Sequence, residues 1–146
     1  MNADPEVRRW FSSTLTREES DAQAALLQNH IATHGFGFWA VEVPGVAPFV
    51  GFVGLQHVGF TAPFTPAVEA GWRLSRAHWG QGYATEAARA CMGLAFESFG
   101  ADKVISLIRP ENVPSRRVAE KNGMTCEKII VWRDYEHCVY AKKSVV

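Results

Sequence analysis

The segment from Val68 to Phe96 constrains the fold of this chain more than any other part of it. Apolar residues alternate with polar or small ones over Val68–Ser75, which predicts a β-strand. Gly80-Gln81-Gly82 follows, and small apolar residues at helical spacing then predict a helix over residues 84–98. A compact apolar run at residues 104–108 predicts the next strand. The chain is therefore expected to contain one β-α-β unit with two parallel strands.

The rest of the chain has the pattern of short helices and hairpins. A helix is expected to begin at Thr16, ahead of acidic residues, and to end at Gly35, while Pro44-Gly45 marks a turn between two strands. The remaining expected elements are helices over residues 4–11, 16–33 and 115–121, and strands over residues 38–43, 49–58, 125–133 and 137–142. This order predicts an α+β fold with a mixed, mostly antiparallel sheet flanked by helices.

Length, charge and cysteine content exclude several classes of protein. The 146 residues fit a single domain, residues 1–146. Fifteen basic and fifteen acidic side chains cancel, so we expect no nucleic-acid partner and no membrane partner. No apolar run reaches the roughly 18–20 residues that span a bilayer, and the polar N-terminus does not have the pattern of a signal peptide. Three cysteines without a CxxC motif predict a cytoplasmic protein with neither a disulfide framework nor a metal site.

Gly80-Gln81-Gly82 lies where a strand gives way to a helix, and this position favours an anion site. The first amides of a helix have no intrahelical acceptor and carry partial positive charge, and glycines let a phosphate approach the backbone. The alternative is a tight turn that binds nothing. A P-loop is excluded because Gly-Lys-Ser/Thr is absent. A dinucleotide fingerprint is disfavoured because its third glycine is replaced by Thr85 and because Asp102 precedes the next strand.

Two stretches of the chain resemble the GNAT N-acetyltransferase superfamily, and most of all its branch of ribosomal-protein-alanine N-acetyltransferases. The first comprises Val68–Leu74 and Trp79–Ala87, with the core Trp-Gly-Gln-Gly-Tyr-Ala-Thr-Glu-Ala. The second is Asn112–Met124, which has the form Asn-x-x-Ser-x-x-Val-x-x-Lys-x-Gly-Met. The resemblance extends from about Asp4 to Trp132. It implies a GNAT-like fold and acetyl-CoA as co-substrate.

The resemblance also implies which residues bind the co-substrate. The main-chain amides from Gln81 to Thr85 would hold the CoA pyrophosphate, and the strand before the loop would run beside the pantetheine arm. Asn112 and Ser115 would lie near the thioester. The implied set is Trp72, Arg73, Leu74, Trp79, Gly80, Gln81, Gly82, Tyr83, Ala84, Thr85, Asn112 and Ser115.

The chain departs from the family pattern at two places. Many members have a tyrosine general acid seven residues after the asparagine, where this chain has Ala119. Members usually have a further strand before the first helix, and the pattern of this chain lacks that first strand. Since an uncovered sheet edge promotes association, we expect a homodimer that pairs or exchanges an edge.

Acetyl transfer to an amine needs a base, and Glu69 is the candidate because it lies opposite in phase to Val68 and Ala70 on its strand. A solvated strand carboxylate is the alternative. Ser115 is the candidate proton donor to the departing thiolate, with a helix N-cap as the alternative. His57 is expected to be a core or rim residue. His30 and His34 are expected to lie on a solvated helix face.

The expected function is N-acetylation of a primary amine, in a small molecule or at a peptide or protein N-terminus. An α-amine, with a pKa of about 8, needs less help from a base than a lysine at about 10.4. A non-catalytic acyl-CoA-binding module of the same fold is the alternative function. Six aromatic residues are candidates for the acceptor pocket: Trp10, Phe11, Phe36, Phe38, Phe60 and Phe64.

Overall fold

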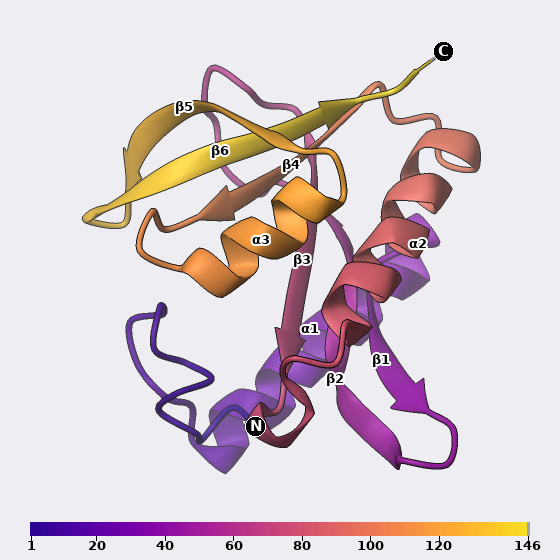
Figure 1. Cartoon of the computed structure of the whole chain (residues 1–146), viewed down its shortest axis with the longest axis vertical. Coiled ribbons are helices and arrows are strands. Elements are labelled where there is room, and N and C mark those ends of the chain that lie inside the picture. Colours follow the sequence, from indigo (N-terminus) through magenta and orange to yellow (C-terminus); the bar gives the residue numbers. More distant parts are fainter. Residues whose placement is uncertain (146) are drawn as a thin grey trace.

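The computed structural model describes residues 1–145, which form a six-stranded sheet with helices on both faces (Figure 1). In chain order the elements are α1 (Arg17–His34), β1 (Phe38–Val43), β2 (Ala47–His57), β3 (Val68–Leu74), a single 3-10 turn (Arg76–His78), α2 (Tyr83–Glu97), β4 (Lys103–Ile108), α3 (Val113–Lys121), β5 (Thr125–Trp132) and β6 (Tyr135–Lys143). The strand order across the sheet is β1-β2-β3-β4-β6-β5.

Only one pair of neighbouring strands in this sheet is parallel. β3 and β4 run parallel with α2 between them in the chain, and every other neighbouring pair is antiparallel. This arrangement confirms the expected α+β fold with its one central β-α-β unit. No strand precedes α1 within the described residues, as the sequence pattern suggested.

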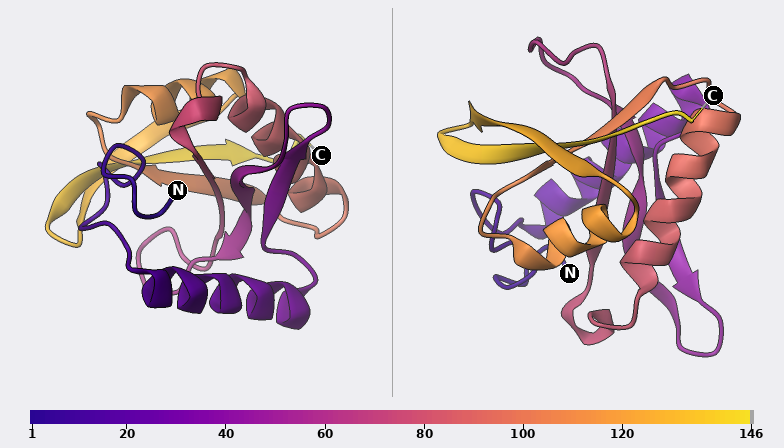
Figure 2. Two further views of the ribbon diagram at one scale, coloured as in Figure 1. Left: turned by 90° about the horizontal axis from the view of Figure 1, so that it is seen from below. Right: turned by 45° about the horizontal axis from the view of Figure 1, so that its top comes forward.

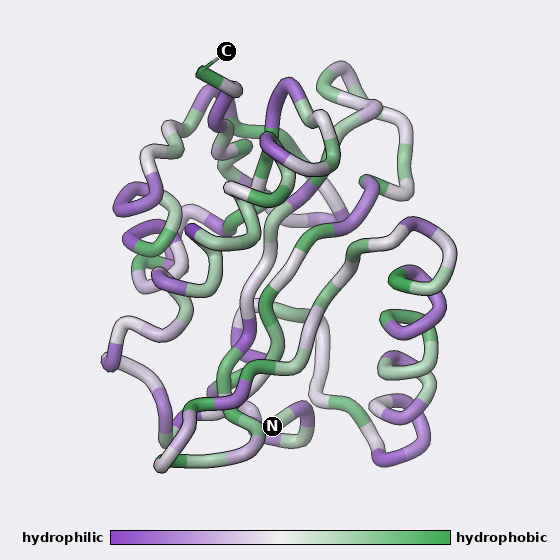
Figure 3. Tube along the Cα trace, turned by 90° about the vertical axis from the view of Figure 1, so that its right-hand side faces the viewer, coloured by the Kyte–Doolittle hydropathy of each residue, from purple (hydrophilic) through white to green (hydrophobic). Residues whose placement is uncertain are grey.

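The two faces of the sheet are covered differently (Figure 2). α2 and α3 pack on one face, where Leu55, Ala70, Ala88 and Ala119 belong to the main buried cluster. α1 crosses the opposite face and buries none of its own residues. Hydrophobic residues gather along the central strands, while hydrophilic residues recur along the surrounding helices and loops (Figure 3). None of the helices within residues 1–145 is long and apolar enough to cross a membrane.

α1 has the ends that its sequence predicts. Thr16 accepts a hydrogen bond from the Glu19 amide at 3.1 Å, and the Glu19 carboxylate accepts one from the Thr16 amide at 2.8 Å. This capping box satisfies two amides that the first turn would otherwise leave unpaired. Gly35 closes the helix in the left-handed conformation, with φ of 79°.

The expected helix over residues 4–11 is wrong. Asp4 does accept a hydrogen bond from the Glu6 amide at 2.9 Å, as a cap would. However, the backbone bond from Arg8 to Asp4 spans four residues, whereas those from Arg9 to Glu6 and from Phe11 to Arg8 span three, so the segment forms separate turns. Tertiary contacts direct this segment: Val7 and Arg8 are buried, and Asp4 also accepts three charged hydrogen bonds from Arg76, at 2.7, 2.8 and 3.0 Å.

Two boundaries also differ from the sequence prediction. α3 begins at Val113 rather than Ser115, because Asn112 caps it. β5 and β6 are joined by two residues, Arg133 and Asp134, rather than by the longer connection expected. Both residues have positive φ, 50° and 68°, which is the conformation that such a short hairpin turn requires.

Candidate active site

The glycine loop joins β3 to α2 and leaves the first amides of α2 uncapped. Gly80 and Gly82 have φ of 74° and 83°, and Gly82 is the N-cap of α2 without any side-chain hydrogen bond. A Cβ atom added at either glycine would meet no heavy atom within 4 Å. The glycines are therefore required by the backbone conformation, and open space lies beside them. The amides of Tyr83, Ala84 and Thr85 begin the helix there, as an anion site requires.

Contacts from both sides hold this loop in place. The Trp79 indole nitrogen donates to the Leu74 carbonyl at 2.9 Å, and the ring remains 44% exposed. The buried Asn122 donates from its amide to the Thr85 carbonyl at 3.2 Å, which ties the end of α3 to the first turn of α2. Trp79 therefore anchors the loop rather than presenting its N–H to a ligand.

β3 and β4 separate at the middle of β3. In their parallel ladder, Val68 pairs with Val104 and Glu69 pairs with Ile105. One residue further, the Ser106 hydroxyl donates to the Ala70 carbonyl at 2.7 Å. A side-chain bond thus replaces the ladder bond at the point where the strands part. Ser106 was missed in the sequence, although it is the one polar residue inside the apolar run of β4.

Beyond this point the main chain of β3 faces an opening on the β4 side. Ser75 donates its amide to Val50 on β2, while the Ala70 carbonyl points to β4. Alternate residues of a strand turn their main-chain groups to opposite neighbours. The main-chain groups of Trp72 and Leu74 therefore point into the opening, whereas those of Arg73 pair with Phe52.

The side chains of the predicted β3 triplet also divide between the two faces. The Trp72 indole donates to the Ser115 hydroxyl at 3.3 Å and so joins β3 to α3. Leu74 is buried in the main cluster. Arg73 lies on the α1 face, where its guanidinium donates to Asn2 at 3.2 Å and stacks on Phe11 at 4.4 Å. The structure thus brings Trp72 and Leu74 to the opening but not Arg73.

Asn112 and Ser115 lie together at the start of α3. The Asn112 side chain accepts a hydrogen bond from the Ser115 amide at 3.4 Å, so Asn112 is the cap and Ser115 lies in the first turn. The N-cap interpretation of Ser115 is wrong for this reason. Its hydroxyl oxygen accepts the Trp72 indole hydrogen, which leaves the hydroxyl hydrogen available for donation.

Glu69 points to the opposite face of the sheet from Trp72, as its phase on β3 predicted. Its carboxylate accepts a hydrogen bond from the Gln56 side chain at 3.0 Å and another from the Leu107 amide. Burial raises the pKa of Glu69 above its usual value, and the two hydrogen bonds only partly oppose this shift. The carboxylate is therefore not a solvated one.

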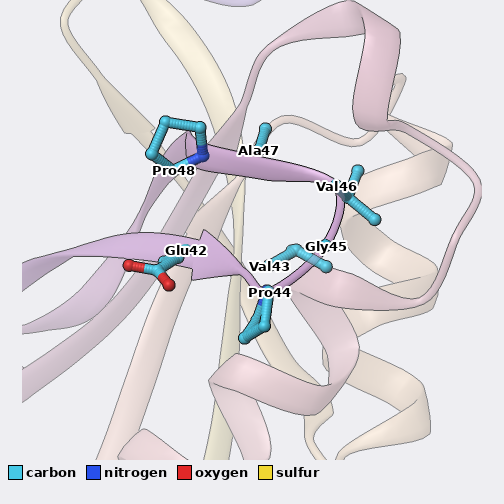
Figure 4. Close-up of a pocket in the computed structure, with 7 residues that line it drawn as sticks. All are labelled: Glu42, Val43, Pro44, Gly45, Val46, Ala47 and Pro48. Atoms are coloured by element: carbon cyan, nitrogen blue, oxygen red, sulfur yellow. The ribbon is translucent and has the colours of Figure 1, made fainter.

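Glu69 lines a hollow of about 320 Å³ between the end of β2 and the β5–β6 turn. The lining residues are Gln56, His57, Gly59, Phe60, Glu69, Trp132 and Arg133. Of the six aromatic candidates, only Phe60 lines this hollow. A second hollow of about 310 Å³ lies at the tip of the β1–β2 hairpin (Figure 4). All its walls come from residues 42–48, and Glu42 is its one titratable side chain, so it brings no catalytic groups together.

The histidines beside this hollow form a structural cluster. His30 contacts the Phe36 carbonyl through Nδ1 at 2.8 Å and accepts the His57 amide at Nε2 at 3.3 Å, so it is not the solvated residue expected. The His34 and His57 rings lie 4.7 Å apart. Burial, with neighbouring His34 and His30, lowers the pKa of His57. No group of residues that could hold a metal ion occurs within residues 1–145.

Position 119 does not supply an acid. Ala119 is fully buried in the main cluster. The nearest tyrosine hydroxyl along α3 is that of Tyr140 from β6, which accepts from Arg116 at 3.0 Å and donates to Glu120 at 2.9 Å. Both positions of this hydroxyl are thus occupied, and Ser115 remains the hydroxyl nearest to the opening among the predicted residues.

The family model of the acetyltransferase (GNAT) domain matches residues 1–125 of this chain. The chain belongs to the GNAT family. It is therefore an acetyl-CoA-dependent acyltransferase.

Two relatives are similar over most of the chain. An uncharacterized protein of Bacillus subtilis, YkkB, is 33% identical over 141 residues, which cover 97% of this chain and 81% of the relative. The FsC-acetyl coenzyme A-N(2)-transacetylase of Aspergillus fumigatus is 33% identical over 139 residues. That match covers 86% of this GNAT protein but 55% of the longer fungal protein.

Solved structures share the fold. A putative GNAT-family acetyltransferase of Bordetella pertussis has a TM-score of 0.79 at 26% identity, covering 94% of this chain and 86% of that one. The putative acetyltransferase yncA of Salmonella typhimurium, solved with acetyl-CoA, has a TM-score of 0.73 at 17% identity, with 95% and 82% covered. The ribosomal-protein-S5-alanine acetyltransferase of Vibrio fischeri has a TM-score of 0.69 at 17% identity, covering 86% of this chain and 71% of that one. This likeness shows the fold alone.

Proposed function

We propose that this GNAT-family protein transfers the acetyl group of acetyl-CoA to a primary amine by direct attack, with Glu69 as the general base. One observation carries the proposal. Glu69 lies at the last paired position of β3 and β4, where the strands part, and its half-buried carboxylate lines a hollow on the face opposite α2 and α3. A base in this position can meet an amine that approaches a thioester held between the strands.

The co-substrate site follows from the main chain. The uncapped amides of Tyr83, Ala84 and Thr85 bind the pyrophosphate, and the glycines leave room for it. The main-chain groups of Trp72 and the Leu74 amide, which point away from β2, pair with the amide groups of the pantetheine arm, whereas the Leu74 carbonyl already accepts the Trp79 indole hydrogen. These contacts need no net positive charge on the protein, which has none.

Each proton transfer in the reaction is assigned to a named side chain. The amine nitrogen attacks the thioester carbonyl carbon, and the Glu69 carboxylate takes a proton from the nitrogen. The carbonyl oxygen becomes an oxyanion that a main-chain amide near Leu74 stabilises. The tetrahedral intermediate then expels the CoA thiolate. The Ser115 hydroxyl donates a proton to the sulfur and takes one back from water, and Glu69 releases its proton to the solvent. The products are the N-acetylated amine and CoA.

The acceptors to be tested include the α-amine of a peptide or protein. The resemblance to the ribosomal-protein-alanine branch favours such an amine, and its pKa of about 8 makes it easier to deprotonate than a lysine side chain. We place the reaction in the cytoplasm, because Cys91, Cys126 and Cys138 are all free thiols.

A second candidate function is an acyl-CoA-binding module that does not transfer the acetyl group. The observation that favours it is Ala119, a buried methyl group at the position where many family members have an acidic hydroxyl. Both candidates require the same co-substrate site and differ only in turnover.

The experiment combines calorimetric titration with a turnover assay. We expect acetyl-CoA to bind with micromolar affinity and NADH not to bind. Glu69→Gln should lower kcat about 10²- to 10⁴-fold, as loss of a general base does. Ser115→Ala should lower kcat less, because the thiolate is a tolerable leaving group. Both variants should retain the acetyl-CoA affinity of the parent.

The outcomes separate the candidates. Binding of acetyl-CoA without thiol release, over a panel of primary amines and peptides, would support the binding module. Turnover that is unchanged in Glu69→Gln under saturating substrate would refute the role of Glu69. If acetyl-CoA does not bind, the loop is only a tight turn.

A further inference from the structure

One cationic side chain lines the hollow together with Glu69, the proposed base. Arg133 lies at its rim, on the two-residue turn between β5 and β6. The guanidinium stacks on the Trp132 ring at 4.5 Å. It makes no ion pair or hydrogen bond with any of residues 1–145. A guanidinium has five donors in a planar fork that suits a carboxylate, so Arg133 presents an unused anion-binding group to the hollow.

The backbone at Arg133 is unfavourable for an arginine. Its φ is 50°, and that of Asp134 is 68°. A two-residue turn of this kind favours asparagine and glycine, because a Cβ atom is crowded in the left-handed region. Residues held in such conformations cluster at functional sites. The turn thus carries an arginine where glycine would be more stable, and this arginine lines the hollow.

Two aromatic rings fix the position of this turn. Phe60, from the loop after β2, stacks on Trp132 at 4.9 Å with an angle of 23° between the rings. The His137 ring packs edge-on against the Trp132 ring, with 5.4 Å between the two ring centroids. Arg133 therefore extends from a rigid aromatic wall. The hollow thus has the cationic Arg133 on this wall and the Glu69 carboxylate on the β3 side.

We infer that the acceptor is a small amine that also carries a carboxylate, of the size of an amino acid. Its amine meets Glu69 and its carboxylate meets Arg133. The inference rests on the proposed acetyl transfer and narrows its acceptor class. The volume of about 320 Å³ is at the lower end for small-molecule sites, which suits a compact ligand. A polycationic amine is disfavoured, because Arg133 would repel it.

The experiment compares acceptors that differ only in the carboxylate. Free L-amino acids and the corresponding amino-acid amides are assayed at saturating acetyl-CoA, with spermidine and an amidated peptide as further acceptors. The amides have the weaker, more easily deprotonated amines, so chemistry alone favours them. We expect kcat/KM to favour the free amino acids by about 10- to 100-fold, which corresponds to one charged hydrogen-bonded contact.

Two glycine variants in the same turn test whether Arg133 causes this preference. Arg133→Gly and Asp134→Gly both relieve a left-handed residue, and each should raise the melting temperature by about 2–5 °C. Only Arg133→Gly removes the guanidinium, so only this variant should lose the preference for the carboxylate. Arg133→Lys should retain part of it. Asp134 does not line the hollow, and Asp134→Gly should keep the preference.

Binding measurements decide the inference independently of turnover. The CoA-loaded protein is titrated with an N-acetyl-amino acid and with its amide while Trp132 fluorescence is followed, and Trp132→Phe identifies the signal. Tighter binding of the acid, lost in Arg133→Gly, supports the inference even if no amine is acetylated, in which case the proposed transfer alone fails. Equal binding of acid and amide, or a preference for spermidine or the peptide, would overturn the inference and leave the acetyl transfer standing.

Discussion

Glu69 shows how one buried carboxylate links stability to activity. Its side chain is enclosed by Gln56, Leu107 and the walls of the hollow, and burial raises its pKa. A raised folded-state pKa means that the group favours the folded state at pH values below the ordinary carboxyl pKa, about 4.3. This contribution is lost as the pH rises through the raised value. At neutral pH the folded protein therefore holds an ionised carboxylate in an unfavourable environment.

Glu69→Gln should consequently be more stable than the parent at pH 7, although it loses activity. Glutamine keeps the shape of the glutamate side chain and does not ionise. The difference in free energy of unfolding between the variant and the parent should therefore vanish below about pH 4, where the parent carboxyl is protonated. Denaturant unfolding of both proteins across this pH range measures the effect. In the same range, kcat/KM of the parent should rise with pH through the raised pKa. A variant that is less stable at pH 7 would show that the carboxylate is stabilising instead.

The strand–loop–helix unit from β3 to α2 is the element in which local geometry and ligand binding coincide. Gly80 and Gly82 hold the left-handed conformation, and neither is crowded by other atoms. A side chain at Gly82 would therefore be opposed by the backbone conformation and not by packing. Gly93, inside the same helix, is equally uncrowded but has no positive φ. The two glycines form a matched pair.

Gly82→Ala should lower both stability and acetyl-CoA affinity, while Gly93→Ala should raise stability and leave affinity unchanged. The first variant forces an alanine into the left-handed region, at about 1–2 kcal/mol. The altered backbone should also displace the first amides of α2, and this displacement should weaken acetyl-CoA binding about tenfold or more. The second variant gains about 0.5–1 kcal/mol of helix propensity. Calorimetric binding and thermal unfolding measure both quantities, and equal affinities for the two variants would contradict the anion site.

At the scale of the whole molecule, the two edges of the sheet differ. β1 forms one edge, and its pairing with β2 is interrupted between Val41 and Val43. β5 forms the other edge. Its pairing with β6 shifts between Cys126 and Lys128 and is regular from Lys128 to Trp132, where Ile129 is 56% exposed and Val131 is 74% exposed. Irregular edges resist pairing, whereas regular apolar edges promote it. β5 is therefore the edge better suited to a second copy.

We propose a homodimer that pairs through β5. Light scattering should show a dimer at micromolar concentration, and Val131→Lys should shift it to monomer, because a charged edge residue blocks pairing. Thr33→Lys, an exposed change on α1, is the control and should leave the dimer intact. A parent protein that stays monomeric at high concentration would exclude the dimer. A dimer that survives Val131→Lys would exclude the β5 edge.

The parts of the site that the sequence predicted are local ones. The loop at Gly80 and Gly82, the caps of α1 and the phase of Glu69 depend on the conformations of a few successive residues. The segment over residues 4–11 has equally good local signals for a helix, yet it forms turns. Contacts outside the segment favour the turns: Val7 and Arg8 are buried in the tertiary structure, the Leu15 amide donates to the Asn2 carbonyl at 2.9 Å, and Asp4 pairs with the distant Arg76.

The sequence alone determined the family, the order of the elements from α1 onward and the position of the glycine loop, because each depends on short-range patterns of glycine, polarity and periodicity. Tertiary structure decided where β3 and β4 part, which face each β3 side chain occupies, and that Arg133 shares a hollow with Glu69. These features depend on contacts between strands or loops: Ser106 with Ala70, Gln56 with Glu69, and Trp132 with Phe60. Contacts between distant segments depend on packing and burial, which no local pattern records.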